Sequence, residues 1–257
     1  MITGFRAATS EKRKLDWFIS LGLGLLAAVV YGLTLCGGAH PGESANLMAV
    51  YGGIEPLELP LHPLWGGIVA WLSRCSFLTL PVRLNLFSLV CSVVSVVLFY
   101  RLMSFLIHDT VTEEYSIEYA PRVSILAGVV SAAAFMFAVP VWHAATRLQY
   151  QSFDLMLAFA AAYLLVLFAE HKWKWTLVVF AVLYGAGVVE SVIFIPLAPV
   201  MLTFLIYVLW KNGELSLSRV AWMGVLAVFG MCLYYVFARR FFNTRDCSVL
   251  GDKSVMD

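Results

Sequence analysis

The residues best suited to chemistry lie in residues 37–81, between two long apolar stretches. This segment carries three carboxylates and two histidines, and it contains no Lys or Arg before Arg74. Glu43 follows a Pro-Gly turn and begins Glu-Ser-Ala-Asn-Leu-Met-Ala, a stretch able to start a helix. A carboxylate placed there can act as a general base toward an acceptor hydroxyl. It can equally be a helix-start acid favoured by the helix dipole, and residue type alone favours this second interpretation.

The other ionisable groups of this segment are weaker candidates. Glu55 and Glu58 are separated by Pro56, and we expect both carboxylates to be solvated. His40 and His62 lack the close spacing of a metal-binding pair, so the sequence predicts no metal site.

A second polar group lies farther along, among apolar stretches. Arg147, Gln149 and Asp154 are close in the sequence, and Glu190 ends another apolar run. A charge inside a membrane is costly and by default suggests function. We expect residues 147–154 to face residues 37–81, where Arg147 can hold a lipid-linked phosphate by a bidentate contact. A structural Arg147–Asp154 pair is the alternative.

The composition defines the setting of these residues. Of the 257 residues, 61% are hydrophobic and 13% charged, and the mean hydropathy is +0.86, whereas a typical soluble domain is about 25% charged. This excludes a soluble globule, a disordered chain and a fibrous repeat. A net charge of +1 argues against a nucleic-acid partner. The five cysteines include no Cys-x-x-Cys and predict neither a disulfide scaffold nor a zinc site.

Continuous apolar runs without period-2 alternation predict helices that cross a membrane. Between Val189 and Val192 only Glu190 and Ser191 interrupt the apolar residues, so the chain must turn tightly there. We expect about seven spans, which makes the fold class an all-α integral membrane bundle. The runs are Trp17–Cys36, Leu84–Ile107, Val123–Val141, Asp154–Ala169, Trp175–Val189, Ser191–Trp210 and Val220–Ala238.

One shorter run, residues 59–73, leaves the topology open. Its prolines and glycines favour an interfacial or re-entrant helix, which makes 37–81 a large first outer loop. If the run crosses instead, there are eight spans, and the positive-inside rule does not separate the two arrangements. The basic cluster before the first run predicts a cytoplasmic N-terminus. The expected organisation is a cytoplasmic segment 1–15, a transmembrane domain 16–240 and a C-terminal tail 241–257.

A collinear series of short motifs over residues 16–210 resembles a known family. The series is Glu-Ser-Ala-Asn from Glu43, Gly-Ile-Glu-Pro-Leu-Glu-Leu-Pro-Leu from Gly53, Arg-Leu-Asn-Leu-Phe-Ser from Arg83, Trp142 through Gln149-Tyr150 to Phe153-Asp154-Leu155, and Gly-Ala-Gly-Val-Val-Glu ending at Glu190. It resembles the bacterial membrane proteins of uncharacterised function that are related to protein O-mannosyltransferases, within the GT-C glycosyltransferase superfamily. Glu43 stands at that family's leading Asp, and His62-Pro63 lies near the place of its His-Pro pair.

The resemblance implies a GT-C-like fold and a definite reaction. A sugar would move from a polyprenyl-phosphate donor to a hydroxyl acceptor at the outer face of a bacterial inner membrane. Glu43 would be the catalytic base, and Arg147 or Arg83 would contact the phosphate. His62, Gln149, Asp154 and Glu190 would line the substrate site, without a cofactor or metal.

Two other functions stay open from the sequence. Asn46, Gln149 and Glu190 replace ionisable residues of the family pattern, which favours a non-catalytic membrane subunit. GT-C enzymes usually continue beyond a seventh helix, so the chain is also expected to be part of a longer protein. A transporter or lipid-handling protein could use Asp154 and Glu190 inside the membrane, although no inverted repeat is visible.

Overall fold

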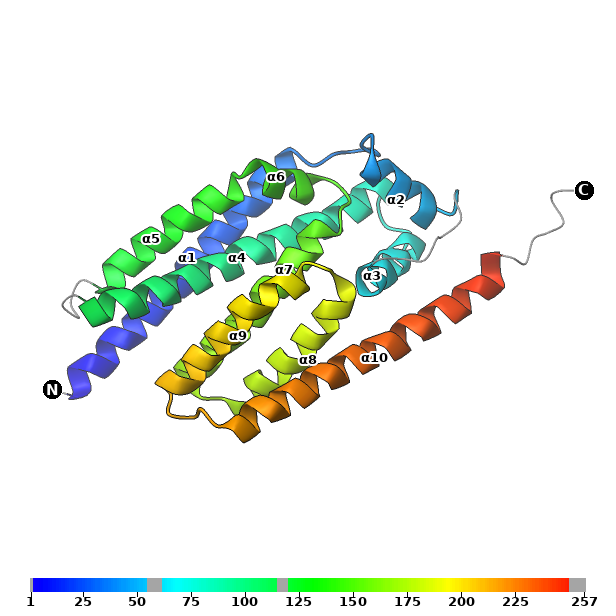
Figure 1. Cartoon of the computed structure of the whole chain (residues 1–257). Helices are drawn as coiled ribbons and strands as arrows, with labels where there is room; N and C mark the ends of the chain where they lie inside the picture. Colours follow the sequence, from blue (N-terminus) through cyan, green and yellow to red (C-terminus); the bar gives the residue numbers. More distant parts are fainter. Residues whose placement is uncertain (1, 55–61, 115–119, 250–257) are drawn as a thin grey trace, which may run out of the picture.

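The described part of the chain is built from helices alone. The computed structural model describes residues 2–54, 62–114 and 120–249, and no strand occurs within these ranges (Figure 1). The elements are α1 (Ile2–Leu33), α2 (Glu43–Tyr51), α3 (Pro63–Arg74), α4 (Leu80–Glu114), α5 (Ala120–Met136), α6 (Val139–Thr146), α7 (Gln151–His171), α8 (Lys174–Glu190), α9 (Phe194–Lys211) and α10 (Leu217–Val249). The predicted all-α class is confirmed.

Long helices run side by side, and the short ones gather at one end. In Figure 1, α1, α4 and α5 form one group, α7 packs against α4, and α8, α9 and α10 complete the bundle. The short helices α2 and α3 lie together at the end where α7 begins and α8 finishes, and α6 lies at the same end beside α4. We call this the site end of the bundle.

Within the described residues, four helices are long and apolar enough to cross a membrane. They are the apolar part of α1 (residues 15–33), most of α4 (residues 80–111), α7 and α9, and the bent pair α5–α6 would make a fifth. Each of the seven predicted runs falls largely within a helix, but α8 has only 17 residues. The apolar part described in α10 is also short, Leu217–Cys232. Since a bilayer core takes roughly 20 residues, the structure supports a membrane protein with four or five candidate spans, and the count of seven stays a prediction.

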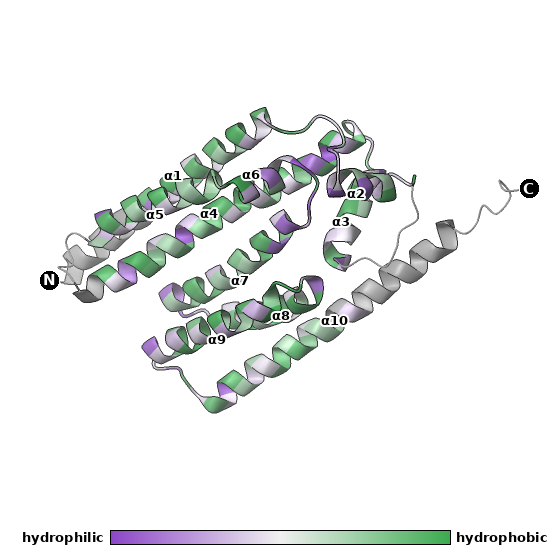
Figure 2. Cartoon of the chain, turned by 45° about the horizontal axis from the view of Figure 1, so that its top comes forward, coloured by the Kyte–Doolittle hydropathy of each residue, from purple (hydrophilic) through white to green (hydrophobic). Residues whose placement is uncertain are grey.

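Apolar side chains cover the outside of several long helices. Phe18 and Leu21 on α1 and Val225 and Phe229 on α10 are each more than half exposed, and Figure 2 shows hydrophobic residues predominating along the bundle. Exposed apolar faces of this extent are unfavourable in water and suited to lipid. This supports the assignment of the chain as an integral membrane protein.

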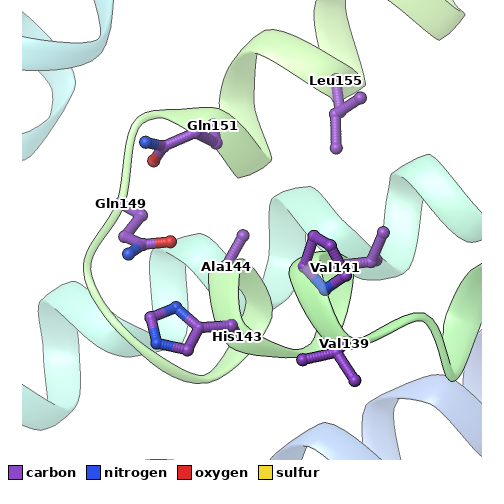
Figure 3. Close-up of a pocket in the computed structure, with 8 residues that line it drawn as sticks. Val139, Val141, His143, Ala144, Gln149, Gln151 and Leu155 are labelled. Atoms are coloured by element: carbon purple, nitrogen blue, oxygen red, sulfur yellow. The ribbon is translucent and has the colours of Figure 1, made fainter.

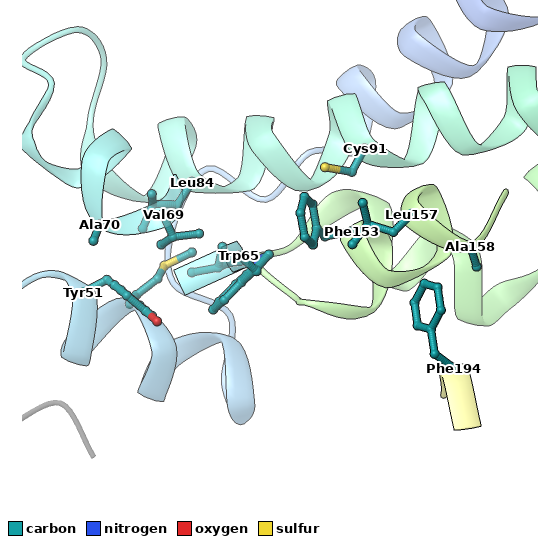
Figure 4. Packing of buried hydrophobic residues seen from close by; sticks show 12 residues of the cluster. Tyr51, Trp65, Val69, Ala70, Leu84, Cys91, Phe153, Leu157, Ala158 and Phe194 are labelled. Carbon is teal, nitrogen blue, oxygen red and sulfur yellow. The ribbon is translucent and has the colours of Figure 1, made fainter. Parts of the chain in front are cut away.

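Helix α3 forms largely within residues 59–73, the short run for which the sequence did not decide between a membrane span and an interfacial helix. It has 12 residues, begins at Pro63 and is too short to span a bilayer. Its Trp65 is buried against Tyr51 of α2, Phe153 of α7 and Leu84 of α4 in one core cluster (Figure 4). This packing fixes α3 at the site end. The sidedness of residues 37–81 stays a prediction, and Glu55 and Glu58 lie outside the described residues.

Small residues allow the closest helix contacts. A Cβ built on Gly185 of α8 would overlap the Ala227 backbone of α10, and one on Gly230 of α10 would overlap the Val182 backbone of α8. Glycine is therefore required at both positions, as is common where membrane helices approach closely. Through this contact α10 supports α8, the helix that carries Glu190 to the site end.

The break between α5 and α6 is a bend of 63°. Pro140 in the first turn of α6 cannot donate a backbone hydrogen bond, so the two helices do not continue as one. The Tyr31 hydroxyl of α1 donates to the Met136 carbonyl at the end of α5, at 2.8 Å. After α6, residues 147–150 reach the start of α2 and α3, where Arg147 contacts His40 and Tyr150 packs against Trp65.

Candidate functional site

Three ionisable side chains from distant parts of the sequence meet at the site end. They are His62, which precedes α3, Asp154 in the first turn of α7 and Glu190 at the end of α8. One nitrogen of His62 and one carboxylate oxygen from each of the other two side chains all lie within 4.8 Å of one another. Asp154 is 4% exposed and Glu190 is fully buried. We call these three residues the triad.

Glu190 is positioned by the start of α3. Its two carboxylate oxygens accept hydrogen bonds from the backbone amides of Leu64 and Trp65, at 2.9 Å each. The side chain of His62, the residue before α3, makes no capping hydrogen bond. Because the first amides of a helix lack partners within the helix and form its positive end, Glu190 satisfies two of them from another part of the chain. It joins α8 to α3.

Asp154 is held by the turn that follows α8. Its Oδ2 accepts a hydrogen bond of 2.6 Å from the Ser191 hydroxyl. Its Oδ1 faces Nδ1 of His62 at 3.7 Å, which is too long for a hydrogen bond. These two atoms are buried, and neither has a hydrogen-bond partner in the structure.

His62 connects the triad to Glu43 through Tyr150. The rings of His62 and Tyr150 are stacked with their centroids 3.9 Å apart, and the Tyr150 hydroxyl is hydrogen-bonded to Glu43. Burial lowers the pKa of His62, and the charge of Glu43 opposes this effect. Burial and the neighbouring Glu43 raise the pKa of Tyr150. Near neutral pH, His62 is therefore uncharged and Tyr150 is protonated and able to donate to Glu43.

Glu43 is the first residue of α2 and is exposed. The interpretation of Glu43 as an acidic residue at the start of a helix is therefore confirmed for its position. Because the Glu43 side chain is exposed, a substrate can reach it. Its hydrogen bond with Tyr150, which stacks on His62, places it beside the triad. The neighbouring Asn46 is exposed and belongs to the same helix.

Arg147 lies in a separate basic group with two histidines. Its guanidinium contacts Nδ1 of His40 at 3.1 Å and also contacts His143. His40 lies three residues before Glu43. Its contact with Arg147 therefore places the segment around Arg147 beside residues 37–54, as expected. The alternative Arg147–Asp154 pair is wrong, because Asp154 instead contacts Ser191 and His62.

Arg83 lies away from the triad and has contacts that explain its burial. Its guanidinium donates to the carbonyls of Ser73 and Phe77, at 2.9 and 2.8 Å, and so holds the C-terminal end of α3. His62 precedes the opposite end of that helix. The structure thus gives Arg83 a structural role, and the expected phosphate contact finds no support here.

The rest of the Arg-Leu-Asn-Leu-Phe-Ser motif also positions loops. Asn85 donates to the carbonyl of Cys36 at 2.7 Å, and the Ser88 hydroxyl accepts from the backbone amide of Gln149 at 3.2 Å. Together with Arg83, these side chains tie three connecting segments to α4. The motif supports the site rather than supplying its chemistry.

Two cavities adjoin this region. A pocket of about 360 Å³ is lined by His143, Gln149, Gln151 and Leu155 among others (Figure 3). An apolar groove of about 810 Å³ runs between α4, α7 and α9, with Leu155 also in its wall. Asp154 lies at the site end of this groove, and Tyr207, near the end of α9, lies toward its other end.

The comparisons with known proteins leave the family open. No protein-family model, no curated protein and no solved structure matches this chain. The resemblance to the GT-C superfamily therefore remains an expectation drawn from short motifs.

The sequence identified all three members of the triad as site residues but not their convergence. It also missed the roles of Tyr150, Ser191 and His143. The contacts of Tyr150 with His62 and of Ser191 with Asp154 join segments far apart in the chain, which no local spacing signals. His143 lies four residues before Arg147, a spacing that places two side chains on the same face of a helix. A weak signal was present in Ser191, the only polar neighbour of Glu190 between two apolar runs.

Proposed function

We propose that this chain binds a polyprenyl-phosphate sugar and transfers the sugar to a hydroxyl acceptor at the membrane surface. The observation that carries the proposal is the groove between α4, α7 and α9, which ends at Asp154 in the polar site. A lipid-linked substrate needs this combination of an apolar channel within the membrane and polar groups at one end of it.

The groove suits a branched hydrocarbon chain. Ala158 and Ala162 line it from α7, and Leu197 and Met201 line it from α9. The small alanines leave space between the helices, and the larger side chains opposite provide apolar contact. Its volume of about 810 Å³ is in the range of ligand sites in proteins, roughly 300–1,000 Å³.

The polar head of such a substrate would lie among the groups of the site end. Leu155 belongs to both cavities, so the groove adjoins the pocket lined by His143 and Gln149. Arg147 contacts His143 at this place and supplies a guanidinium suited to a phosphate. In this arrangement the phosphate binds near Arg147 and the sugar extends toward Glu43.

Glu43 would then act as the general base. It accepts the proton of the acceptor hydroxyl, whose oxygen forms a bond to the anomeric carbon of the sugar. The bond between that carbon and the phosphate oxygen breaks, and the polyprenyl phosphate leaves with the electron pair. Tyr150 orients the Glu43 carboxylate, and transfer needs only positioning and proton abstraction. The proposal places this end of the bundle outside a bacterial inner membrane, with the N-terminus in the cytoplasm.

The test is transfer from a labelled polyprenyl-phosphate sugar by the purified chain in lipid vesicles. Glu43→Gln should lower the rate by about 10²–10⁴-fold, the usual effect of losing a general base. Glu170→Gln, which makes the same change at the opposite end of α7, should leave the rate unchanged.

Three outcomes would contradict the proposal. Full activity of the Glu43→Gln variant would remove Glu43 from the chemistry. A folded chain that binds the donor but transfers nothing would favour the non-catalytic alternative, and donor movement across the vesicle membrane without transfer would favour a lipid-handling protein.

A further inference from the structure

The triad offers three metal-ligand atoms at one place. One ring nitrogen of His62 and one carboxylate oxygen each of Asp154 and Glu190 lie within 4.8 Å of one another. Zn²⁺ binds histidine nitrogens and carboxylate oxygens at about 2.0–2.2 Å, which puts neighbouring ligands roughly 3.4 Å apart. The His62–Asp154 separation of 3.7 Å is close to this value, so small side-chain movements would complete the coordination.

Two buried atoms without hydrogen-bond partners, Oδ1 of Asp154 and Nδ1 of His62, indicate a ligand between these side chains. Asp154 is only 4% exposed, yet its Oδ1 has no hydrogen-bond partner, and neither has Nδ1 of His62. Buried polar atoms are almost always satisfied, and an exception calls for an explanation. A bound cation between the two atoms satisfies both.

The charge balance favours a divalent ion. Asp154 and Glu190 bring two carboxylates into a buried place, where uncompensated charge is strongly unfavourable. Two nearby arginines are engaged elsewhere, Arg147 with His40 and His143, and Arg83 with backbone carbonyls. An ion of charge +2, two carboxylates and a neutral imidazole give a site with no net charge.

The surrounding contacts hold each ligand in place. Ser191 donates to the other oxygen of Asp154, the amides of Leu64 and Trp65 donate to Glu190, and the His62 ring is stacked on Tyr150. Metal ligands are commonly oriented by outer hydrogen bonds of this kind. Each of these contacts leaves a ligand atom or lone pair for the ion.

We propose that His62, Asp154 and Glu190 bind one Zn²⁺ ion. One nitrogen and two oxygen ligands from three side chains leave a fourth position open, as in zinc sites that bind water or substrate. His40 and His143 form no rival site, because the Arg147 cation lies between them. This proposal departs from the sequence analysis, which predicted no metal, and it does not depend on the proposed transferase function.

The test measures zinc bound to the purified full chain in detergent after equilibration with Zn²⁺ and removal of the excess. We expect one ion per chain for the native sequence. Asp154→Asn and His62→Gln should each weaken binding by at least about 10²-fold, more than the loss of an outer partner costs. Neither change removes an acceptor from the α3 amides, so both variants keep the Glu190 contacts.

His143→Gln is the matched control and should still bind one ion. Size-exclusion elution and thermal unfolding in EDTA identify which variants are folded. The proposal is overturned if the native chain binds no zinc. It is equally overturned if folded Asp154→Asn and His62→Gln variants bind zinc as the native chain does. Zinc binding without sugar transfer would support the ion site and count against the transferase.

Discussion

The contact between Glu190 and the start of α3 predicts a large loss of stability in Glu190→Ala. Glu190 is fully buried and accepts hydrogen bonds from the amides of Leu64 and Trp65, at 2.9 Å each. Depriving a buried amide of its acceptor costs about 1–3 kcal/mol, so removing both acceptors should lower the free energy of unfolding by about 2–6 kcal/mol. The same change should loosen α3 from the bundle, because α3 has only 12 residues and depends on tertiary contacts.

Glu190→Gln keeps the size of the side chain while changing its hydrogen bonds, so it shows how much of the stability loss in Glu190→Ala comes from the hydrogen bonds. The amide oxygen of Gln accepts one of the two bonds, while its NH₂ group faces the other backbone amide, so we expect about half the loss seen with Ala. Glu170→Ala serves as a control, since its side chain is 47% exposed in the last turn of α7. It should change the free energy of unfolding by less than about 0.5 kcal/mol.

The assay is reversible unfolding in mixed detergent micelles, carried out in EDTA so that metal binding does not contribute. Limited proteolysis of α3 in the same samples reports local loosening. A Glu190→Ala variant within about 0.5 kcal/mol of the native chain, with α3 equally protected, would refute the reasoning.

Three further variants test other parts of the structure. Gly185→Val should destabilise the chain by at least about 1–3 kcal/mol, the usual range for overpacking, because its side chain overlaps the Ala227 backbone; unfolding in micelles measures this, and a native midpoint would contradict the close α8–α10 contact. Tyr31→Phe removes the hydrogen bond to Met136 and should cost about 0.5–1.5 kcal/mol in the same assay, whereas Thr203→Val, at an exposed position, should be nearly neutral. Arg147→Ala should weaken binding of the polyprenyl-phosphate sugar at least tenfold while Arg219→Ala, whose guanidinium contacts Glu214, leaves it unchanged; equal affinities would remove Arg147 from the phosphate site.

The sequence predicts the helices of this protein well. Hydrophobic runs near the length of a bilayer account for α1, α4, α7 and α9, and the short interruption at Glu190 and Ser191 coincides with the turn between α8 and α9. These features depend on local composition and length, which are directly readable. The number of spans is less accessible, because α8 and the apolar part of α10 are near the shortest length that can cross.

The site was only partly predictable, for a physical reason. Glu190 and Asp154 stand out because charges in apolar surroundings need partners. Their partners cannot be read from the sequence, since Leu64 and Glu190 are 126 positions apart. For Arg83 the sequence suggested a phosphate contact from its charge alone. In the structure its guanidinium donates to backbone carbonyls at the end of α3.

The central claim is that the groove between α4, α7 and α9 holds the lipid chain of the substrate. The most direct measurement is photo-cross-linking with a polyprenyl-phosphate sugar that carries a diazirine on its lipid chain, followed by mapping of the labelled peptides. We predict labelling of α7 around Ala158 and of α9 around Met201, abolished by excess unlabelled polyprenyl phosphate. Labelling confined to the exposed faces of α1 and α10, or labelling that does not respond to the competitor, would contradict the claim.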